Sequence, residues 1–193
     1  MTNPKRAILL RGKEKSLSRK HPWIFSGALK HHDKDIEEGD LVRVFSSEGE
    51  FLCIGHWQNG SIAVKVLSFE NERIDYGFVL ERIRTAVELR QTIGMFTDKD
   101  TTIFRLVNGE GDFMPSLIAD YYDGLVVVQF HSIGMYLLKE EIVQALKEIL
   151  QDNCKAIYCK SSSTLPKQEG IIAKDEFMFG TLEEDWYALE NGI

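Results

Sequence analysis

The stretch LVRVFSSEGEFLCIGHWQNGSIAVKVL, residues 41–67, decides the fold of the first third of the chain. A polar turn with a glycine separates its first two apolar runs, which predicts two antiparallel strands joined by a hairpin. Asn59-Gly60 is a second turn signal, and a third apolar run follows it. Together with a further apolar run at residues 7–10, these short segments predict a small, mostly β barrel over residues 1–69.

A polar and aromatic segment precedes this stretch. Residues 13–20 predict a loop or a short helical turn, and Pro22 forbids a continuous helix beyond them. In an extended segment Trp23 and Phe25 lie on one face, and aromatic pairs on one face are more often core than surface. We therefore expect Trp23 and Phe25 in the barrel core, with stacking on unpaired bases as the alternative.

The period of the apolar residues changes after residue 75, from alternation to a spacing of three and four that is typical of helices. The chain is therefore predicted to be α+β, with the small β barrel followed by a central domain of the strand-strand-helix-strand-strand type over residues 70–175. Residues 176–193 are predicted to start a β-hairpin that leads to a further domain. The predicted helices lie at residues 79–90 and 138–149, and the predicted strands at 102–108, 116–121, 125–131, 156–159, 177–180 and 186–193.

Charge is divided unevenly along the chain. Residues 1–30 hold eight Lys or Arg against one Glu, a net charge of +7, so the overall charge of -7 leaves -14 for the rest. Screening confines each field to about 10 Å, so a basic patch attracts phosphates even on an acidic protein. A solvated face is the alternative interpretation. The residues predicted to contact RNA are Arg11, Lys13, Lys15, Arg19, Lys20 and His21.

Other classes of protein are disfavoured by what the sequence does not contain. No apolar run approaches the roughly 20 residues that span a bilayer, and the start of the chain does not resemble a signal peptide, so we expect a cytoplasmic protein without membrane contact. Cys53, Cys154 and Cys159 lack the paired spacing of a zinc site or a disulfide framework. His31, His32 and His56 have no companion at ligand spacing, so no metal site is expected.

Several segments carry a resemblance to one enzyme family. They are RGKEKSL (11–17), HPWIFSGA (21–28), FRLVNGEGD (104–112), PSLIADYY (115–122) and VVQF (127–130), with KQEG (167–170) and ENG (190–192) in the same order. The sequence resembles the bacterial large-subunit ribosomal-RNA methyltransferases that make 5-methylcytosine. The resemblance implies an N-terminal PUA domain, a central α/β domain, a C-terminal methyltransferase domain, and S-adenosylmethionine as methyl donor.

The resemblance also implies that these residues lack the catalytic domain, because the chain ends where that domain would begin. A donor site of the Rossmann type needs a glycine-rich turn that opens a helix, and the turn at 109–111 is followed by a segment ending in Pro115. Methylation at carbon five of cytosine needs a cysteine nucleophile, and none of the three cysteines has the Pro-Cys context of this family. We expect no catalytic residue and no cofactor site here.

The sequence therefore predicts the ribosomal-RNA-binding part of such an enzyme, inactive by itself. Two alternatives stay open: a protein-interaction or dimerisation module, with a homodimer as one form, and the RNA-binding part of an enzyme that modifies transfer RNA. Glu110 and Asp112 could form a catalytic or cation-binding pair, but turn formation is the favoured interpretation. The hydroxyls at 161–164 suit either a phosphate or a polar loop.

Overall fold

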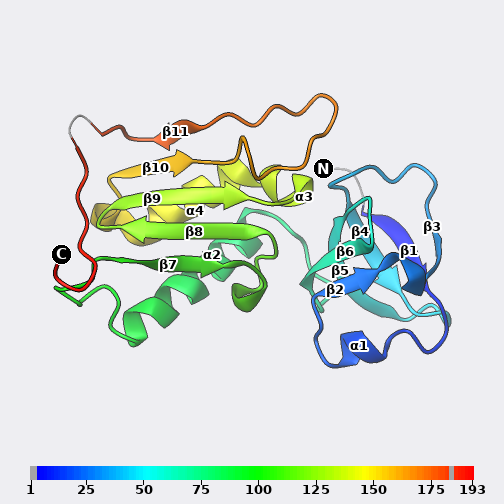
Figure 1. The fold of residues 1–193 in the computed structure, drawn as a ribbon. Coiled ribbons are helices and arrows are strands. Elements are labelled where there is room, and N and C mark those ends of the chain that lie inside the picture. The colour runs from blue at the N-terminus through cyan, green and yellow to red at the C-terminus, as the bar shows by residue number, and fades with distance from the viewer. Residues whose placement is uncertain (1–3, 183–184) are drawn as a thin grey trace. The chain divides into compact units, whose positions relative to one another are not determined.

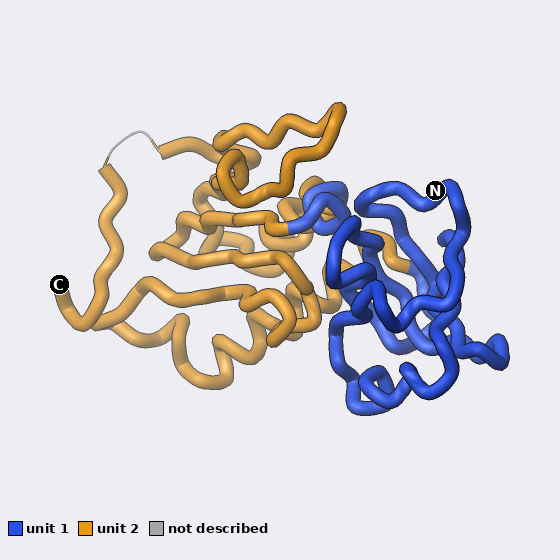
Figure 2. Tube along the Cα trace, turned by 45° about the vertical axis from the view of Figure 1, so that its right-hand side comes forward, with its two compact units in different colours: residues 1–73, 132–137 blue, residues 74–131, 138–193 orange. Residues whose placement is uncertain are grey.

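The computed structural model describes residues 4–182 and 185–193 (Figure 1). Contacts within the chain define two compact units (Figure 2). The first comprises the residues up to Arg73 together with Ser132–Leu137, and the second comprises Ile74–His131 and Leu138–Ile193. In the first unit a short piece from the middle of the sequence therefore joins the N-terminal residues.

The first unit is built on a six-stranded sheet in the order β2-β6-β5-β4-β1-β3. β1 pairs with β4 in parallel, and the other pairs are antiparallel. The predicted hairpin is confirmed, because β4 and β5 pair antiparallel across a turn at Gly49. The strands are β1 (Lys5–Leu9), β2 (Trp23–Phe25), β3 (Leu29–His32), β4 (Leu41–Phe45), β5 (Phe51–Trp57) and β6 (Ile62–Ser68), and the helical segments are α1 (Lys15–Ser18), η1 (Ser26–Ala28) and α3 (Ile133–Tyr136).

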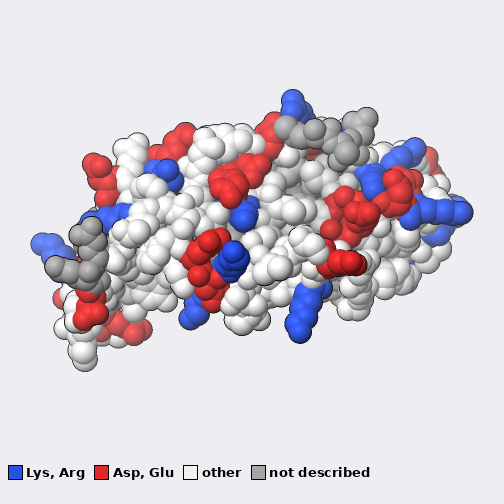
Figure 3. Space-filling model, turned by 90° about the horizontal axis from the view of Figure 1, so that it is seen from above, with Lys and Arg blue, Asp and Glu red and all other residues white. Residues whose placement is uncertain are grey.

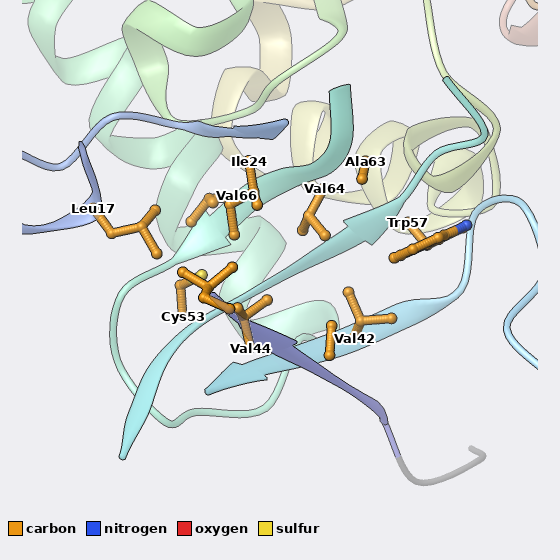
Figure 4. Close-up of a cluster of buried hydrophobic side chains, with 11 residues drawn as sticks. Leu17, Ile24, Val42, Val44, Cys53, Trp57, Ala63, Val64 and Val66 are labelled. Carbon is orange, nitrogen blue, oxygen red and sulfur yellow. The ribbon is translucent and has the colours of Figure 1, made fainter. Parts of the chain in front are cut away.

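One face of this curled sheet encloses a hydrophobic core, shown in Figure 4. Alternate residues of β4, Val42 and Val44, belong to this core, as the period of two in a strand requires; β6 contributes Ala63, Val64 and Val66, and α1 contributes Leu17. From β2 the core receives Ile24, which is 3% exposed. The expectation that Phe25 packs in the core is wrong, because Phe25 is 50% exposed. Trp23 is half-buried. The inward position of this three-residue strand goes to Ile24, and alternation then turns both aromatic neighbours to the opposite face.

β5 is buried on both faces, because α3 packs against the side away from this core. Gly134 of α3 lies so close to His56 that a Cβ atom there would overlap the imidazole ring. Gly39 adopts a φ of +89°, and a Cβ there would lie 2.9 Å from Ile133 Cγ2. Burial lowers the pKa of His56 to about 4, so this ring is neutral at neutral pH.

The second unit is a five-stranded sheet in the order β11-β10-β9-β8-β7, in which β9 and β10 are parallel and the other pairs antiparallel. α2 packs against α4 and β7. The predicted helices and the first four predicted strands are confirmed. The elements are α2 (Tyr76–Thr92), β7 (Ile103–Asn108), η2 (Gly109–Asp112), β8 (Leu117–Tyr122), β9 (Leu125–Phe130), α4 (Lys139–Leu150), η3 (Gln151–Asn153), β10 (Ala156–Cys159) and β11 (Glu176–Phe179).

The C-terminal hairpin was expected from two apolar segments, and only one of them is a strand. β11 pairs with β10 rather than with residues 186–193, and the latter, where described, form no strand. Their polar groups bind elsewhere: the Leu189 N–H donates to Thr102 Oγ1 at 3.0 Å, and Trp186 Nε1 donates to the Tyr122 carbonyl at 2.6 Å. Residues 183 and 184, within the expected hairpin connection, lie outside the described residues.

The fold is thus a mixed α and β structure with a small curled β sheet first, as expected from the sequence. None of the described helices has the length and apolar character needed to cross a membrane.

Candidate nucleic-acid interface

The residues predicted to contact RNA lie on one continuous segment, residues 11–21, which we call the basic loop. It leaves β1 through a turn in which Gly12 has a φ of +81°, where a side chain would be strained. The Lys13 N–H donates to the Leu10 carbonyl at 3.1 Å, and the Leu10 N–H donates to the Ala28 carbonyl at 2.9 Å. The start of the loop is therefore tied to the segment that precedes β3.

The middle of the basic loop is held by a single apolar side chain. Leu17 of α1 is 4% exposed and belongs to the core of the first unit, while its neighbours in the helix are exposed. Because Leu17 takes the inward direction, the charged side chains around it face solvent. All six predicted contact residues are exposed: Arg11, Lys13, Lys15, Arg19, Lys20 and His21.

The cations of the basic loop are not neutralised by the rest of the described chain. None of its five Lys and Arg side chains forms an ion pair with an acidic residue that the structure describes. The one acid of the loop, Glu14, has a carboxylate oxygen buried without a hydrogen-bond partner. On the face shown in Figure 3, by contrast, acidic and basic side chains are interspersed. An unneutralised cationic segment suits a polyanion, since each phosphate contact releases counterions.

Aromatic rings adjoin the end of the basic loop. The His21 ring centroid lies 5.8 Å from that of Trp23 and 6.5 Å from that of Phe25. The Trp23 N–H donates to His21 Nδ1 at 3.2 Å, and the same nitrogen lies 3.3 Å from the Trp23 carbonyl oxygen, so this side of the ring is tied to the backbone. Lys20 Nζ lies 4.6 Å from the ring centroid of Phe69, a cation–π contact that holds the lysine at the sheet.

Sequence reasoning favoured a core position for Phe25 and kept base stacking as the alternative, and the ring is 50% exposed. Its half-exposed ring next to a cationic loop is the arrangement on which unpaired bases stack. The signal was present in the neighbouring residue, because Ile24 is β-branched and better suited to a buried strand position than an aromatic flanked by a polar turn.

The three cysteines are packed in the interior. Burial raises the pKa of Cys53 to about 12 and that of Cys154 to about 11. The pKa of Cys159 is also raised, again chiefly by burial. A thiol with a raised pKa stays protonated at neutral pH and is a poor nucleophile, so these side chains act as small hydrophobic groups.

The glycine-rich turn at 109–112 is bound to α2 and β7 within the second unit. Asp112 forms two hydrogen bonds with Arg90, from Nη1 to Oδ1 at 2.6 Å and from Nη2 to Oδ2 at 2.8 Å. The Asn108 N–H donates to Asp112 Oδ2 at 2.6 Å, and Arg90 Nε donates to the Arg105 carbonyl at 3.1 Å. Both partners of this pair are less than a tenth exposed. The turn interpretation of Asp112 is thus supported.

The turn at 109–112, which the sequence offered as the nearest match to a donor site, does not fit S-adenosylmethionine. The turn at 109–112 is a single 3-10 turn that ends at Phe113 in the left-handed region, so it opens no helix toward a cofactor. Its acid is already bound to Arg90. Nor do the described residues gather three or more His, Cys, Asp or Glu side chains in a group that could hold a metal ion.

The polar loop after β10 uses its hydroxyls within the fold. Ser161 Oγ accepts from the Phe130 N–H at 3.0 Å, and Thr164 Oγ1 donates to the Phe130 carbonyl at 2.9 Å. Ser162 Oγ donates to Asp175 Oδ2 at 2.7 Å. The polar-loop interpretation is therefore better supported than phosphate binding.

Known proteins are similar to this chain in sequence and in fold. Residues 7–69 match the family model of a PUA-like domain, so the first unit contains such a domain. Ribosomal RNA large subunit methyltransferase I of Alteromonas mediterranea is 34% identical over 96% of the chain and 46% of its own length. A Bacillus subtilis protein provisionally named ribosomal RNA large subunit methyltransferase YwbD is 36% identical over 92% of the chain and 44% of its own length. The chain thus spans about half the length of the curated relatives it matches.

Solved structures show the same fold. A Streptococcus mutans protein described as a candidate SAM-dependent methyltransferase matches 97% of the chain and 46% of its own length, with a TM-score of 0.80 and 19% identity. A second structure, described as a candidate methyltransferase complexed with SAH, gives a TM-score of 0.79, also at 19% identity. At this level of identity the match concerns the fold alone.

Proposed function

We propose that these 193 residues are the RNA-docking part of a cytoplasmic, SAM-dependent methyltransferase that makes 5-methylcytosine in 23S ribosomal RNA. Arg11, Lys13, Arg19 and the other cations of the basic loop contact the phosphates, and His21 contacts the RNA beside them. The residues from Ile74 onward position this docking unit for a methyltransferase domain. Methyl transfer and donor binding belong to residues outside this segment.

The observation that carries the proposal is the set of exposed, unneutralised cations on a PUA-like domain. The names of the relatives support the RNA class, and the burial of all three cysteines supports a nucleophile outside these residues. The logarithm of the RNA association constant falls linearly with the logarithm of the salt concentration. Each phosphate contact makes that slope more negative by about 0.9 for a duplex and about 0.7 for a single strand. Docking by this loop is therefore steeply dependent on salt.

The test is fluorescence anisotropy of a labelled large-subunit RNA fragment titrated with the chain at several salt concentrations. The triple variant Arg11→Glu, Lys13→Glu and Arg19→Glu is expected to weaken binding by roughly 100-fold or more at low salt and to flatten the salt slope by about 2 to 3. The matched control reverses three exposed lysines of the second unit, Lys99, Lys167 and Lys174, so the total charge changes equally.

Unchanged affinity and slope in the triple variant, or an equal loss in the control, would show that the basic loop does not bind RNA. Competition between unlabelled 23S fragments and transfer RNA tests the RNA class. Better competition by transfer RNA would contradict the ribosomal assignment and favour an enzyme that modifies transfer RNA. Sedimentation of the chain without RNA reveals whether it self-associates, as the dimerisation alternative requires.

A further inference from the structure

A cavity of about 580 Å³ lies in the first unit, and none of its lining residues belongs to the basic loop. Its walls come from β3 with the residues that follow it, and from the turn between β5 and β6. Ligand pockets in proteins have volumes of roughly 300 to 1,000 Å³, so this cavity has room for a small organic group.

The lining of this cavity includes two lysines and two histidines. Lys30, His31, His32 and Lys34 contribute to it, all four are exposed, and the lining includes no Asp or Glu. None of the four forms an ion pair within the part of the chain that the structure describes. An anionic group that enters the cavity would meet the ammonium groups of Lys30 and Lys34, neither of which is ion-paired with an acidic residue of the described chain.

Three acidic side chains near these lysines and histidines in the sequence bind to β1 or to the turn after β5. Asp33 Oδ2 accepts from the Arg6 N–H at 2.7 Å, and Asp35 pairs with Lys5 Nζ at 3.3 Å. Glu38, the acid nearest to the turn after β5, accepts a hydrogen bond from the Asn59 N–H. The three carboxylates thus anchor the segments that form the walls, and the lysines and histidines of the same segment line the cavity.

The cavity also contains an aromatic pair. The rings of His32 and Trp57 lie 4.7 Å apart between centroids, with an angle of 48° between their planes. Trp57 is 8% exposed and its Nε1 donates to Asn59 Oδ1 at 3.1 Å, so the indole is fixed. His32 Nδ1 lies 2.9 Å from the Asp33 carbonyl oxygen, which orients the exposed imidazole. A fixed, exposed ring backed by a buried one is a platform for a flat ligand.

Amide groups complete the lining. Gln58 and Asn59 both line the cavity. A side-chain amide can donate and accept hydrogen bonds, as the edge of a base does. Lysines for phosphate, a ring for stacking and amides for a base edge are the set of groups with which proteins hold single-stranded RNA.

We propose that this cavity binds one unpaired nucleotide of the RNA, separately from the phosphate contacts of the basic loop. The base stacks on His32 and its edge meets the amides of Gln58 and Asn59, while Lys30 and Lys34 hold the flanking phosphates. Bases paired within a duplex are already stacked on their neighbours and are not available to this site. The inference rests on the proposed RNA-docking function and adds to it a preference for a single-stranded segment.

The experiment compares three probes with the full chain by fluorescence anisotropy: a labelled ten-nucleotide single-stranded RNA, the same RNA in a duplex, and unlabelled uridine monophosphate as competitor. His32→Ala is expected to weaken binding of the single strand by about 10-fold, the loss of one stacked base, with little change for the duplex. Lys30→Glu with Lys34→Glu is expected to weaken it further and to flatten its salt slope. The matched control is Lys99→Glu with Lys174→Glu, and circular dichroism confirms that each variant is folded.

Direct placement comes from photocrosslinking. A single 4-thiouridine in the single-stranded probe is expected to crosslink to peptides that contain residues 30–34 or 57–60, and His32→Ala is expected to reduce the yield. Crosslinks confined to other peptides, or equal single-strand binding by His32→Ala and the unchanged chain, would overturn the inference. Competition by uridine monophosphate as strong as that by the RNA strand would overturn the assignment to RNA, because the site would then take a free nucleotide.

The two proposals fail in different ways. If the cavity variants bind RNA normally while the triple variant of the basic loop does not, the cavity assignment is wrong and the docking function stands. If neither set of variants affects binding, both are wrong.

Discussion

The basic loop and the turn at 109–112 use the same kinds of charged residue in opposite ways. At the turn, Arg90 and Asp112 are buried together, and each is also bound to backbone groups of the same unit. In the basic loop, five cations lie exposed with no acidic partner among the described residues. Paired, buried charges hold a fold in one arrangement, whereas exposed and unpaired charges leave their interaction energy for a partner. Pairing and burial therefore separate the supporting residues from the candidate binding residues.

The largest effect is expected from removing one partner of the buried Arg90–Asp112 pair. Asp112→Ala leaves the Arg90 guanidinium buried without its carboxylate, which typically costs about 3 to 5 kcal/mol of unfolding free energy. Urea denaturation followed by circular dichroism measures it. Lys13→Ala is the counterpart in the basic loop, with an expected change within about 0.5 kcal/mol because no contact is lost. Similar losses in the two variants would remove the distinction between supporting and binding charges.

A second prediction sharpens the comparison within a single strand. Ile24→Ala removes a side chain from the core and is expected to cost about 2 to 5 kcal/mol, whereas Phe25→Ala removes a half-exposed ring and is expected to cost far less. RNA affinity is expected to reverse this order, with a loss for Phe25→Ala and almost none for Ile24→Ala while the protein remains folded. Denaturation and RNA titration of the same two proteins test it. A Phe25→Ala protein as unstable as Ile24→Ala would mean that this ring is part of the core after all.

The smallest expected effect concerns a titratable group that is buried without a charged partner. The pKa of His56 is about 4 in the folded chain, against about 6.5 when unfolded. Between these values the unfolded chain binds more protons, so stability present above about pH 6.5 is lost as the pH falls toward 4, by about 2 to 3 kcal/mol at pH 4.5. Urea unfolding at pH 7 and pH 4.5 is expected to show this loss, and His56→Gln should remove that share of it. An identical pH dependence in the variant would exclude His56 as the source.

Local sequence patterns were sufficient for most of the secondary structure. The hairpin of β4 and β5, the helices α2 and α4, and the strands β7 to β10 follow from spacing and turn residues, because period and turn chemistry act over a few neighbours. The expected strand at residues 186–193 failed, although its apolar content was suitable. Strands need a paired edge that continues over several residues, and this segment instead makes scattered hydrogen bonds to residues 100–102 and to Tyr122.

The candidate site was only partly predictable. The six predicted contact residues are visible as a charge excess, because the only acid among them in the sequence is Glu14. An exposed Phe25 was only the less favoured alternative, and the cavity beside His32 was not found. The exposure of Phe25 depends on which of two neighbouring side chains turns inward. The cavity depends on the meeting of β3 with a turn some 25 residues later. No local pattern encodes either feature.

By itself the sequence determined the hairpin of β4 and β5, the helices α2 and α4, the strands β7 to β10, the concentration of positive charge in the first 30 residues, and the resemblance to an RNA-modifying family. Only the tertiary structure decided that Ile24 rather than Phe25 is buried, that Asp112 belongs to Arg90, and that Ser132–Leu137 completes the first unit. The physical reason is range: propensity, period and charge are properties of adjacent residues. Burial and pairing depend on which distant segments share a core, and those contacts exist only once the chain has folded.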